Sequence, residues 1–165
     1  MGSYTDIEGG FDVVGMRFAV VCGRFNDFVT NALLDGARAG FARHGVEPTQ
    51  VREYWVPGAF EMPLVAKTLG ANGDVDAVVC LGAVIRGDTP HFDYVAGQCA
   101  DGLTRAALDT GVPVVFGVLT VDTVEQAEVR SRPDTSNKGF EAAATAIEMV
   151  DLLRRLGSYA SEAGR

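Results

Sequence analysis

The chain has 165 residues, of which 47% are hydrophobic and 22% are charged, a composition typical of one globular domain with a full core. Its formal net charge of −8 leaves no basic surplus, which argues against a general binder of nucleic acids or anionic membranes. The sequence has neither a secretory signal at its start nor a run of about 18 apolar residues. We therefore expect a cytoplasmic protein in which any phosphorylated ligand is held by a local site.

The first half of the chain alternates predicted strands and helices. The apolar run Arg17–Cys22 predicts a buried strand, and Phe28–His44 has the apolar spacing of a helix. The next strand, Val51–Val56, alternates apolar and polar residues, so we expect it nearer an edge of the sheet. A short helix over Phe60–Leu69 follows.

The second half repeats this alternation and then ends in two helices. Thr89 and Pro90 precede the third helix as its predicted N-cap and first helical residue. The predicted elements are a strand over Ala77–Ile85, a helix over His91–Leu108, a strand over Val112–Leu119, and helices over Val124–Arg130 and Lys138–Leu156.

The order β-α-β-α-β-α-β-α-α predicts a parallel sheet with right-handed crossovers and helices on both faces. Residues 13–156 are expected to form this single domain, and residues 157–165 a disordered tail. Residues 1–12 are expected either to be flexible or to pair with the sheet edge of a neighbouring subunit. The three cysteines lack the spacing of metal ligands, so no zinc site is expected, and Cys22 and Cys80 should be buried free thiols.

Ligands of open parallel α/β sheets bind beyond the carboxyl ends of the strands. The loops that leave the carboxyl ends of the predicted strands are Gly23–Asp27, Pro57–Glu61, Arg86–His91 and Thr120–Thr123. In the first of these loops, Phe25 either caps the core or stacks on a flat heterocycle. In the second loop, Glu61 either complements the helix dipole or accepts hydrogen bonds from ligand hydroxyls.

The loop Arg86–His91 has the clearest signs of chemistry. The backbone N–H groups of Asp88 and Thr89 lie at a helix start, where anions bind readily. The positive helix end favours the neutral form of His91, which can then transfer protons near neutral pH, although an ordinary surface histidine is the alternative. After the fourth strand, Arg130 suits either a bidentate phosphate contact or a surface ion pair.

The chain also contains the motifs Gly23-Arg24-Phe25-Asn26, Val56-Pro57-Gly58-Ala59-Phe60-Glu61, Gly82-Ala83-Val84-Ile85-Arg86-Gly87, Thr89-Pro90-His91-Phe92-Asp93-Tyr94-Val95, Gly117-Val118-Leu119-Thr120 and Asn137-Lys138-Gly139. In order and spacing, over about residues 13 to 156, they resemble the 6,7-dimethyl-8-ribityllumazine synthase family. The resemblance implies a flavodoxin-like three-layer αβα sandwich with a central four-stranded parallel sheet.

The resemblance also implies a transferase of riboflavin biosynthesis that needs no metal or other cofactor. The implied reaction condenses 5-amino-6-(D-ribitylamino)uracil with 3,4-dihydroxy-2-butanone 4-phosphate and releases phosphate and water. Members of the family form homopentamers with active sites between subunits. The resemblance leaves open whether pentamers assemble into a 60-subunit icosahedral shell, and whether riboflavin synthase associates with it.

By resemblance, Phe25 stacks on the pyrimidine ring, His91 transfers protons, and Arg130 binds the phosphate from a neighbouring subunit. The carboxylate of Asp88 would repel a phosphate, so we expect it to point outward while its N–H binds. The other implied contacts are Ala59, Phe60 and Glu61 for the ribityl chain and ring edge, Ala83, Val84 and Ile85 for the pyrimidine, Asp88 and Thr89 for the phosphate, and Phe116 as a pocket wall.

Two other functions are compatible with parts of this pattern. One is a flavin- or lumazine-binding shell without catalysis, which would need the ring site but no phosphate site. The presence of Thr89, His91 and Arg130 together argues against it. The other is an enzyme on a similar fold that dismutates lumazine to riboflavin, and it would consume lumazine alone.

Overall fold

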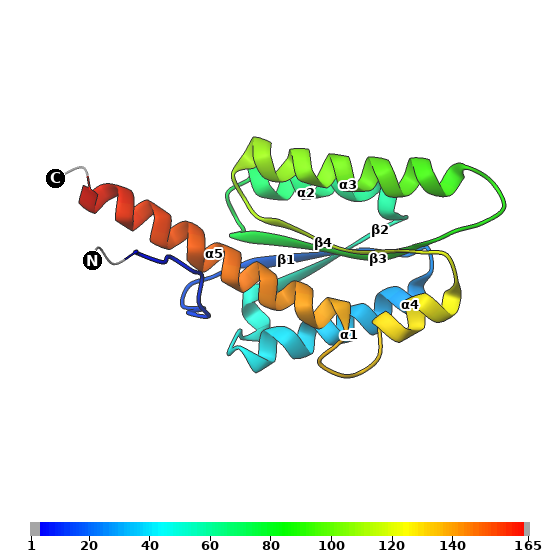
Figure 1. Ribbon diagram of the computed structural model, residues 1–165, viewed down its shortest axis with the longest axis horizontal. Coiled ribbons are helices and arrows are strands. Elements are labelled where there is room, and N and C mark those ends of the chain that lie inside the picture. Colours follow the sequence, from blue (N-terminus) through cyan, green and yellow to red (C-terminus); the bar gives the residue numbers. More distant parts are fainter. Residues whose placement is uncertain (1–3, 164–165) are drawn as a thin grey trace.

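In the computed structural model of the chain, which describes residues 4–163, four strands form one parallel sheet (Figure 1). The sheet order is β2-β1-β3-β4, so β2 lies at an edge, as predicted. The last strand begins at Val114 rather than Val112, because Pro113 has no N–H to give to the ladder. The strands are β1 (Phe18–Gly23), β2 (Val51–Val56), β3 (Ala77–Ile85) and β4 (Val114–Val121).

Helices cover both faces of the sheet, which confirms the predicted αβα layers. Figure 1 shows α2 and α3 on one face and α1, α4 and α5 on the other. Two short 3₁₀ helices, η1 (Pro48–Gln50) and η2 (Ala59–Glu61), lead into β2 and α2. The α-helices are α1 (Asp27–Arg43), α2 (Met62–Ala71), α3 (His91–Thr110), α4 (Val124–Arg130) and α5 (Lys138–Ala163).

Several helix ends differ from the prediction by one residue or more. Helix α3 begins at His91, the start of its predicted range, but its N-cap is Pro90 rather than Thr89 and it continues past Leu108 to Thr110. A 3₁₀ turn takes up the predicted first turn of α2, which begins at Met62. Helix α5 continues to Ala163, past its predicted end at Leu156. The predicted segments 1–12 and 157–165 lie partly outside the described residues.

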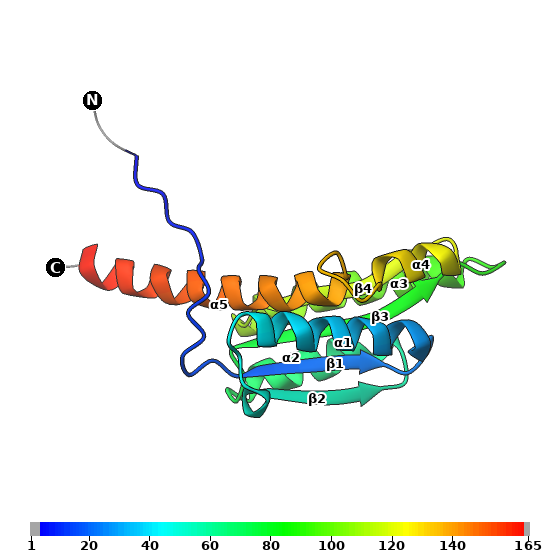
Figure 2. The ribbon, with the colours of Figure 1, turned by 90° about the horizontal axis from the view of Figure 1, so that it is seen from below.

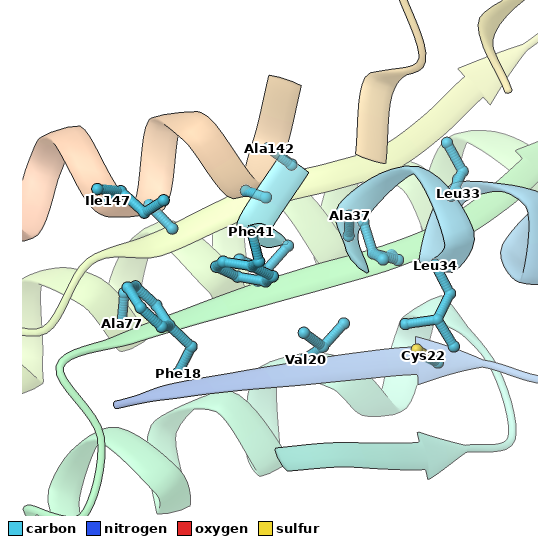
Figure 3. Close-up of a cluster of buried hydrophobic side chains, with 14 of the residues drawn as sticks. Phe18, Val20, Cys22, Leu33, Leu34, Ala37, Phe41, Ala77, Ala142 and Ile147 are labelled. Carbon is cyan, nitrogen blue, oxygen red and sulfur yellow. The ribbon is translucent and has the colours of Figure 1, made fainter. Parts of the chain in front are cut away.

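The larger core lies between the sheet and the pair α1 and α5 (Figure 3). Phe18 of β1 and Phe41 of α1 pack with ring centroids 4.8 Å apart. On α5, Ile147 is fully buried, whereas Leu153, farther along the helix, is 41% exposed. The second core lies under α2 and α3 and is built from smaller residues. Its members include Ala19, Val21, Met62, Cys99 and Leu103.

The three cysteines are buried and free, as predicted for Cys22 and Cys80. Burial raises the pKa of the Cys22 thiol to about 12 and that of Cys99 to about 11. The pKa of Cys80 is raised by burial as well. The thiols are therefore protonated at neutral pH, and their contribution is to packing.

The N-terminal segment runs across α5 (Figure 2). Gly10 N–H donates to Asp151 Oδ2 at 2.6 Å, and Arg155 Nε donates to the same oxygen at 2.6 Å. These two donors hold the pKa of the Asp151 carboxyl below its usual range. Phe11 stacks on His44 with ring centroids 4.4 Å apart. Pairing of this segment with a neighbouring subunit stays a prediction.

Asn137 joins the start of α5 to α1 and to the loop before α5. Its side chain is fully buried, and Nδ2 donates to the carbonyl oxygens of Ala32 (3.1 Å) and Arg132 (2.9 Å). Its Oδ1 accepts from the N–H groups of Gly139 (2.8 Å) and Phe140 (3.4 Å). One amide thus hydrogen-bonds four backbone groups, and its bond with the Gly139 N–H is fully buried.

We expect Asn137→Ala to lower the free energy of unfolding by about 3 kcal/mol, because it removes four hydrogen bonds at once and leaves the buried Gly139 N–H without this acceptor. The exposed Asn72→Ala is the control, and it should change stability by less than about 0.5 kcal/mol. Urea denaturation of both variants measures the difference. Equal stabilities would show that the Asn137 hydrogen bonds are replaced at no cost.

Candidate active site

A pocket of about 610 Å³ lies beyond the carboxyl ends of β1, β2 and β3, where the fold class places ligands. We call it the ring pocket. It brings together loops that are far apart in the sequence. The predicted site residues that line it are Phe25, Ala59, Phe60, Glu61, Ala83, Val84, Ile85, Thr89 and His91.

Large aromatic side chains surround the mouth of the ring pocket. Phe25 is 73% exposed, so it does not cap the core. Phe60 is 57% exposed and Tyr94 is 69% exposed. Single exposed aromatic rings are common on protein surfaces, but three around one pocket offer apolar faces to a ligand or a partner.

The loop that carries Phe25 is fixed at several points. Arg24 N–H donates to Val56 O at 2.9 Å, and Phe25 N–H donates to Pro57 O at 3.0 Å. Asn26 adopts a left-handed conformation (φ 60°, ψ 44°), and its Nδ2 donates to Ala83 O at 2.9 Å. Asn26 occupies the N-cap position of α1 but makes no side-chain capping bond, so its amide ties β1 to β3 instead.

Gly58 keeps the pocket floor open between two side chains. A Cβ atom at this position would lie 3.5 Å from Glu61 Oε2 and 3.8 Å from Phe25 Cβ. The carboxylate of Glu61 therefore lies on the same side of the loop as the Phe25 side chain. Ala83 and Val84, which also line the pocket, are buried.

The segment from Gly87 to Pro90 is exposed and leads into the first turn of α3. Thr89 Oγ1 accepts a weak hydrogen bond from His91 N–H at 3.4 Å, which explains why a capping pattern was predicted there. Asp88 is not among the residues that line the ring pocket. His91 and Tyr94 share a face of α3 through their i, i+3 spacing.

The structure does not bring Phe116 and Arg130 into the ring pocket. Both line a separate groove of about 690 Å³ along the outer edge of β4, which we call the β4 groove. None of the residues that the structure describes lines both sites. Phe116 is 45% exposed on the edge strand, and Arg130 Nη1 donates to Gln126 O at 3.0 Å.

The sequence reasoning missed two residues of these sites. Lys138 lines the β4 groove beside Arg130, and its Nζ lies 2.6 Å from Glu141 Oε2. Lys138 belongs to the motif Asn137-Lys138-Gly139 at the start of the last helix, and this position could have indicated a functional residue. Tyr94 lines the ring pocket, and its spacing from His91 was the corresponding signal.

The titratable side chains that line the ring pocket are Glu61, His91 and Tyr94. Across residues 4–163, no group of three or more His, Cys, Asp or Glu is placed to hold a metal ion. In the same part of the chain, no helix is both long and apolar enough to cross a membrane.

The sheet and its pocket define the class of protein: a parallel α/β protein with a candidate small-molecule site beyond its strand ends. The family profile described as 6,7-dimethyl-8-ribityllumazine synthase matches residues 15–154. A 6,7-dimethyl-8-ribityllumazine synthase of Syntrophus aciditrophicus (strain SB) is 54% identical over 152 residues, which are 92% of this chain and 99% of the relative. The chain therefore belongs to the 6,7-dimethyl-8-ribityllumazine synthase family, which confirms the resemblance in the sequence.

We expect Asn26→Ala to lower the free energy of unfolding by about 2 kcal/mol, about half from the lost hydrogen bond and half from the left-handed backbone. Asn26→Gly loses the same hydrogen bond but adopts this backbone freely, so it should lose only about half as much. Chemical denaturation of the two variants separates the contributions. Equal losses would mean that the backbone conformation costs nothing.

Proposed function

We propose that the activity of this family, the synthesis of 6,7-dimethyl-8-ribityllumazine in riboflavin biosynthesis, takes place in the ring pocket. The substrates are 5-amino-6-(D-ribitylamino)uracil and 3,4-dihydroxy-2-butanone 4-phosphate. The observation that carries the proposal is the convergence of three separate motifs, those around Phe25, Glu61 and His91, on one pocket. The pocket offers a different kind of group to each part of the two substrates.

The pyrimidine ring stacks on Phe25, whose exposed face suits a flat heterocycle. Backbone groups of Ala83, Val84 and Ile85 hydrogen-bond the polar ring edge. On the opposite wall, Glu61 accepts hydrogen bonds from ribityl hydroxyls, and Ala59 and Phe60 hold the rest of the chain. Ring and chain thus extend between the ends of β3 and β2.

The phosphate of the second substrate binds at the start of α3. The N–H groups of Asp88 and Thr89 donate to it, and the helix dipole favours its negative charge. The Asp88 carboxylate stays outside the pocket, which limits its repulsion of the phosphate.

The reaction joins two partners that are already reactive, so holding them together supplies much of the rate enhancement. The 5-amino group attacks the ketone, and loss of a first water gives an imine. Phosphate then leaves, the ring closes and a second water is lost. His91 accepts and returns protons in these steps, since it is the histidine that lines the pocket.

No lysine or arginine is among the described residues that line the ring pocket. A phosphate dianion therefore lacks a cation within one chain. We assign that cation to Arg130 of a neighbouring copy, with Phe116 beside it as a further wall of the site. A closed ring of copies, the homopentamer of the family, gives every ring pocket one β4 groove. Assembly into a 60-subunit shell and association with riboflavin synthase stay open.

The direct test incubates the purified protein with both substrates and follows lumazine absorbance and fluorescence. Product formation supports the proposal, and its absence with folded protein would overturn it. Consumption of lumazine alone would indicate the dismutating enzyme instead. Tight flavin binding without turnover would indicate a binding protein.

His91→Ala should lower kcat by about 100-fold, the lower end of what general acid–base catalysis contributes. The thermal unfolding midpoint should stay the same, because the side chain is exposed. His44→Ala is the matched control, since His44 packs against Phe11 away from the pocket and its loss should leave kcat near that of the wild type. An unchanged kcat in His91→Ala would remove the acid–base role.

Arg130→Ala should raise the KM of the phosphorylated substrate by about 10- to 100-fold, as expected for a lost hydrogen bond to a charged group. The KM of the pyrimidine substrate should change little. Arg132→Ala is the control, because Arg132 does not line the β4 groove. Steady-state kinetics with each substrate varied in turn would show the difference, and equal effects on both KM values would argue against a phosphate contact.

A further inference from the structure

The segment from Gly87 to Thr89, which the proposed function makes an anion site, has very few hydrogen bonds of its own. Among the described residues, its backbone N–H groups have no hydrogen-bond partner. Its contacts are limited to the 3.4 Å bond from His91 N–H to Thr89 Oγ1 and, just beyond it, the 3.0 Å bond from Asp93 N–H to Pro90 O. Free amides suit an anion, but a loop without internal bonds needs another means of keeping its place.

Arg86 spans the two ends of this loop. Its Nε donates to Asp122 Oδ1 at 2.9 Å, at the end of β4, and its Nη1 donates to Asp93 Oδ1 at 3.3 Å, in the first turn of α3. Its guanidinium carbon lies 4.1 Å from the centroid of the Phe92 ring. Its own N–H donates to Val121 O at 2.9 Å, so the residue is also anchored in the sheet.

The anchor on β4 is itself held firmly. Asp122 N–H donates to Gln126 Oε1 at 2.8 Å, and Gln126 N–H donates to the N-cap oxygen Thr123 Oγ1 at 3.2 Å. The carboxylate that receives Arg86 therefore belongs to a capped helix start rather than to a free loop.

These ion pairs are exposed, with side-chain exposures of 44% for Arg86, 63% for Asp93 and 66% for Asp122. Exposed pairs contribute little to global stability, so this network is not explained by folding. The carboxylates of Asp93 and Asp122 already neutralise the positive charge of the Arg86 guanidinium. They raise the pKa of Arg86, and the hydrogen bond to Asp122 is the largest cause. Arg86 is thus poorly suited to act as a free cation, and its geometry is that of a cross-link.

We propose that Arg86 is a positioning residue: it braces the β3–α3 loop from both ends, so that the amides of Asp88 and Thr89 stay fixed yet free to bind phosphate. This inference rests on the proposed phosphate site in that loop. The planar guanidinium is required because its N–H groups point in two fixed directions toward two carboxylates. The brace replaces the internal hydrogen bonds that would otherwise use up the amides.

The test measures inorganic phosphate binding by calorimetry and steady-state kinetics with both substrates in Arg86→Met, which keeps an apolar contact with Phe92. We expect the Kd of phosphate and the KM of the phosphorylated substrate to rise about tenfold, because small misplacements of binding groups are costly. The KM of the pyrimidine substrate and the thermal midpoint should stay near the wild-type values. Arg105→Met is the matched control, since Arg105 pairs only loosely with Asp101 (3.7 Å) farther along α3.

Arg86→Lys separates a brace from a simple charge effect. Lysine keeps the charge but cannot donate along both fork directions, so the brace predicts weak phosphate binding, as in Arg86→Met. Wild-type phosphate binding in Arg86→Lys would overturn the inference. In addition, Asp122→Ala should weaken phosphate binding, and combining it with Arg86→Met should add little. Additive effects, or tighter binding in Asp122→Ala, would contradict the brace.

The two proposals fail in different ways. If the wild-type protein makes no lumazine, the proposed function is wrong. The second outcome is an active wild-type protein, with the same KM for the phosphorylated substrate and the same Kd for phosphate in Arg86→Met and Arg105→Met. In that case only the positioning role of Arg86 is wrong.

Discussion

The parallel alignment of β1, β2 and β3 is the constraint on which the candidate site depends. Parallel pairing puts the three carboxyl ends at the same edge of the sheet, with β1 and β2 ending as a pair at Gly23 and Val56 and β3 continuing beyond them to Ile85, so the loops after these strands meet there. The Asn26 amide then fixes the first loop to the end of β3 through Ala83 O. A slip in this register would separate Phe25 from the backbone at Ala83–Ile85, and the ring pocket would lose one of its walls.

A second constraint is electrostatic. The chain has a net charge of −8, and the described lining of the ring pocket contains no lysine or arginine. In the proposed function, phosphate binding therefore depends on local donors: the amides at the start of α3, and a cation from a neighbouring copy. The β4 groove, which contains Arg130 and Lys138, lies at the outer edge of β4 and is separate from the ring pocket. Under this proposal one chain carries both parts of the phosphate site, but on different surfaces.

The sequence predicted best those elements whose signal is local. The valine-rich run Ala77–Ile85 and the helix Val124–Arg130 have their predicted bounds, because burial pattern and capping chemistry both lie within the segment. The prediction that Phe25, Glu61 and His91 lie at one pocket followed from two sources. One is the rule that ligands bind beyond the carboxyl ends of parallel strands, and the other is the set of family motifs. The wrong N-cap of α3 shows the limit, since Thr89 and Pro90 are adjacent candidates for one position.

The features that the sequence did not predict depend on tertiary contacts. Asn26 occupies the N-cap position of α1, but its left-handed backbone turns the side chain toward Ala83 O. Leu153 fits the apolar spacing of α5 yet is exposed. Lys138 lines the β4 groove only because the fold places the start of α5 beside β4. Periodicity describes a face of a helix, but not which neighbour covers that face or how far it extends.

The central claim is that one copy completes the site of the next. It is tested most directly by mixing His91→Ala subunits, with their low kcat, and Arg130→Ala subunits, with their high KM for the phosphorylated substrate, after dissociation and reassembly. Each variant keeps the half that the other lacks, so random assembly should restore about one quarter of the sites at a heterologous interface. Recovered activity of that order, with a wild-type KM for the phosphorylated substrate, is the predicted result. No recovery in mixed, correctly assembled oligomers would contradict the account and place both residues in the site of one chain.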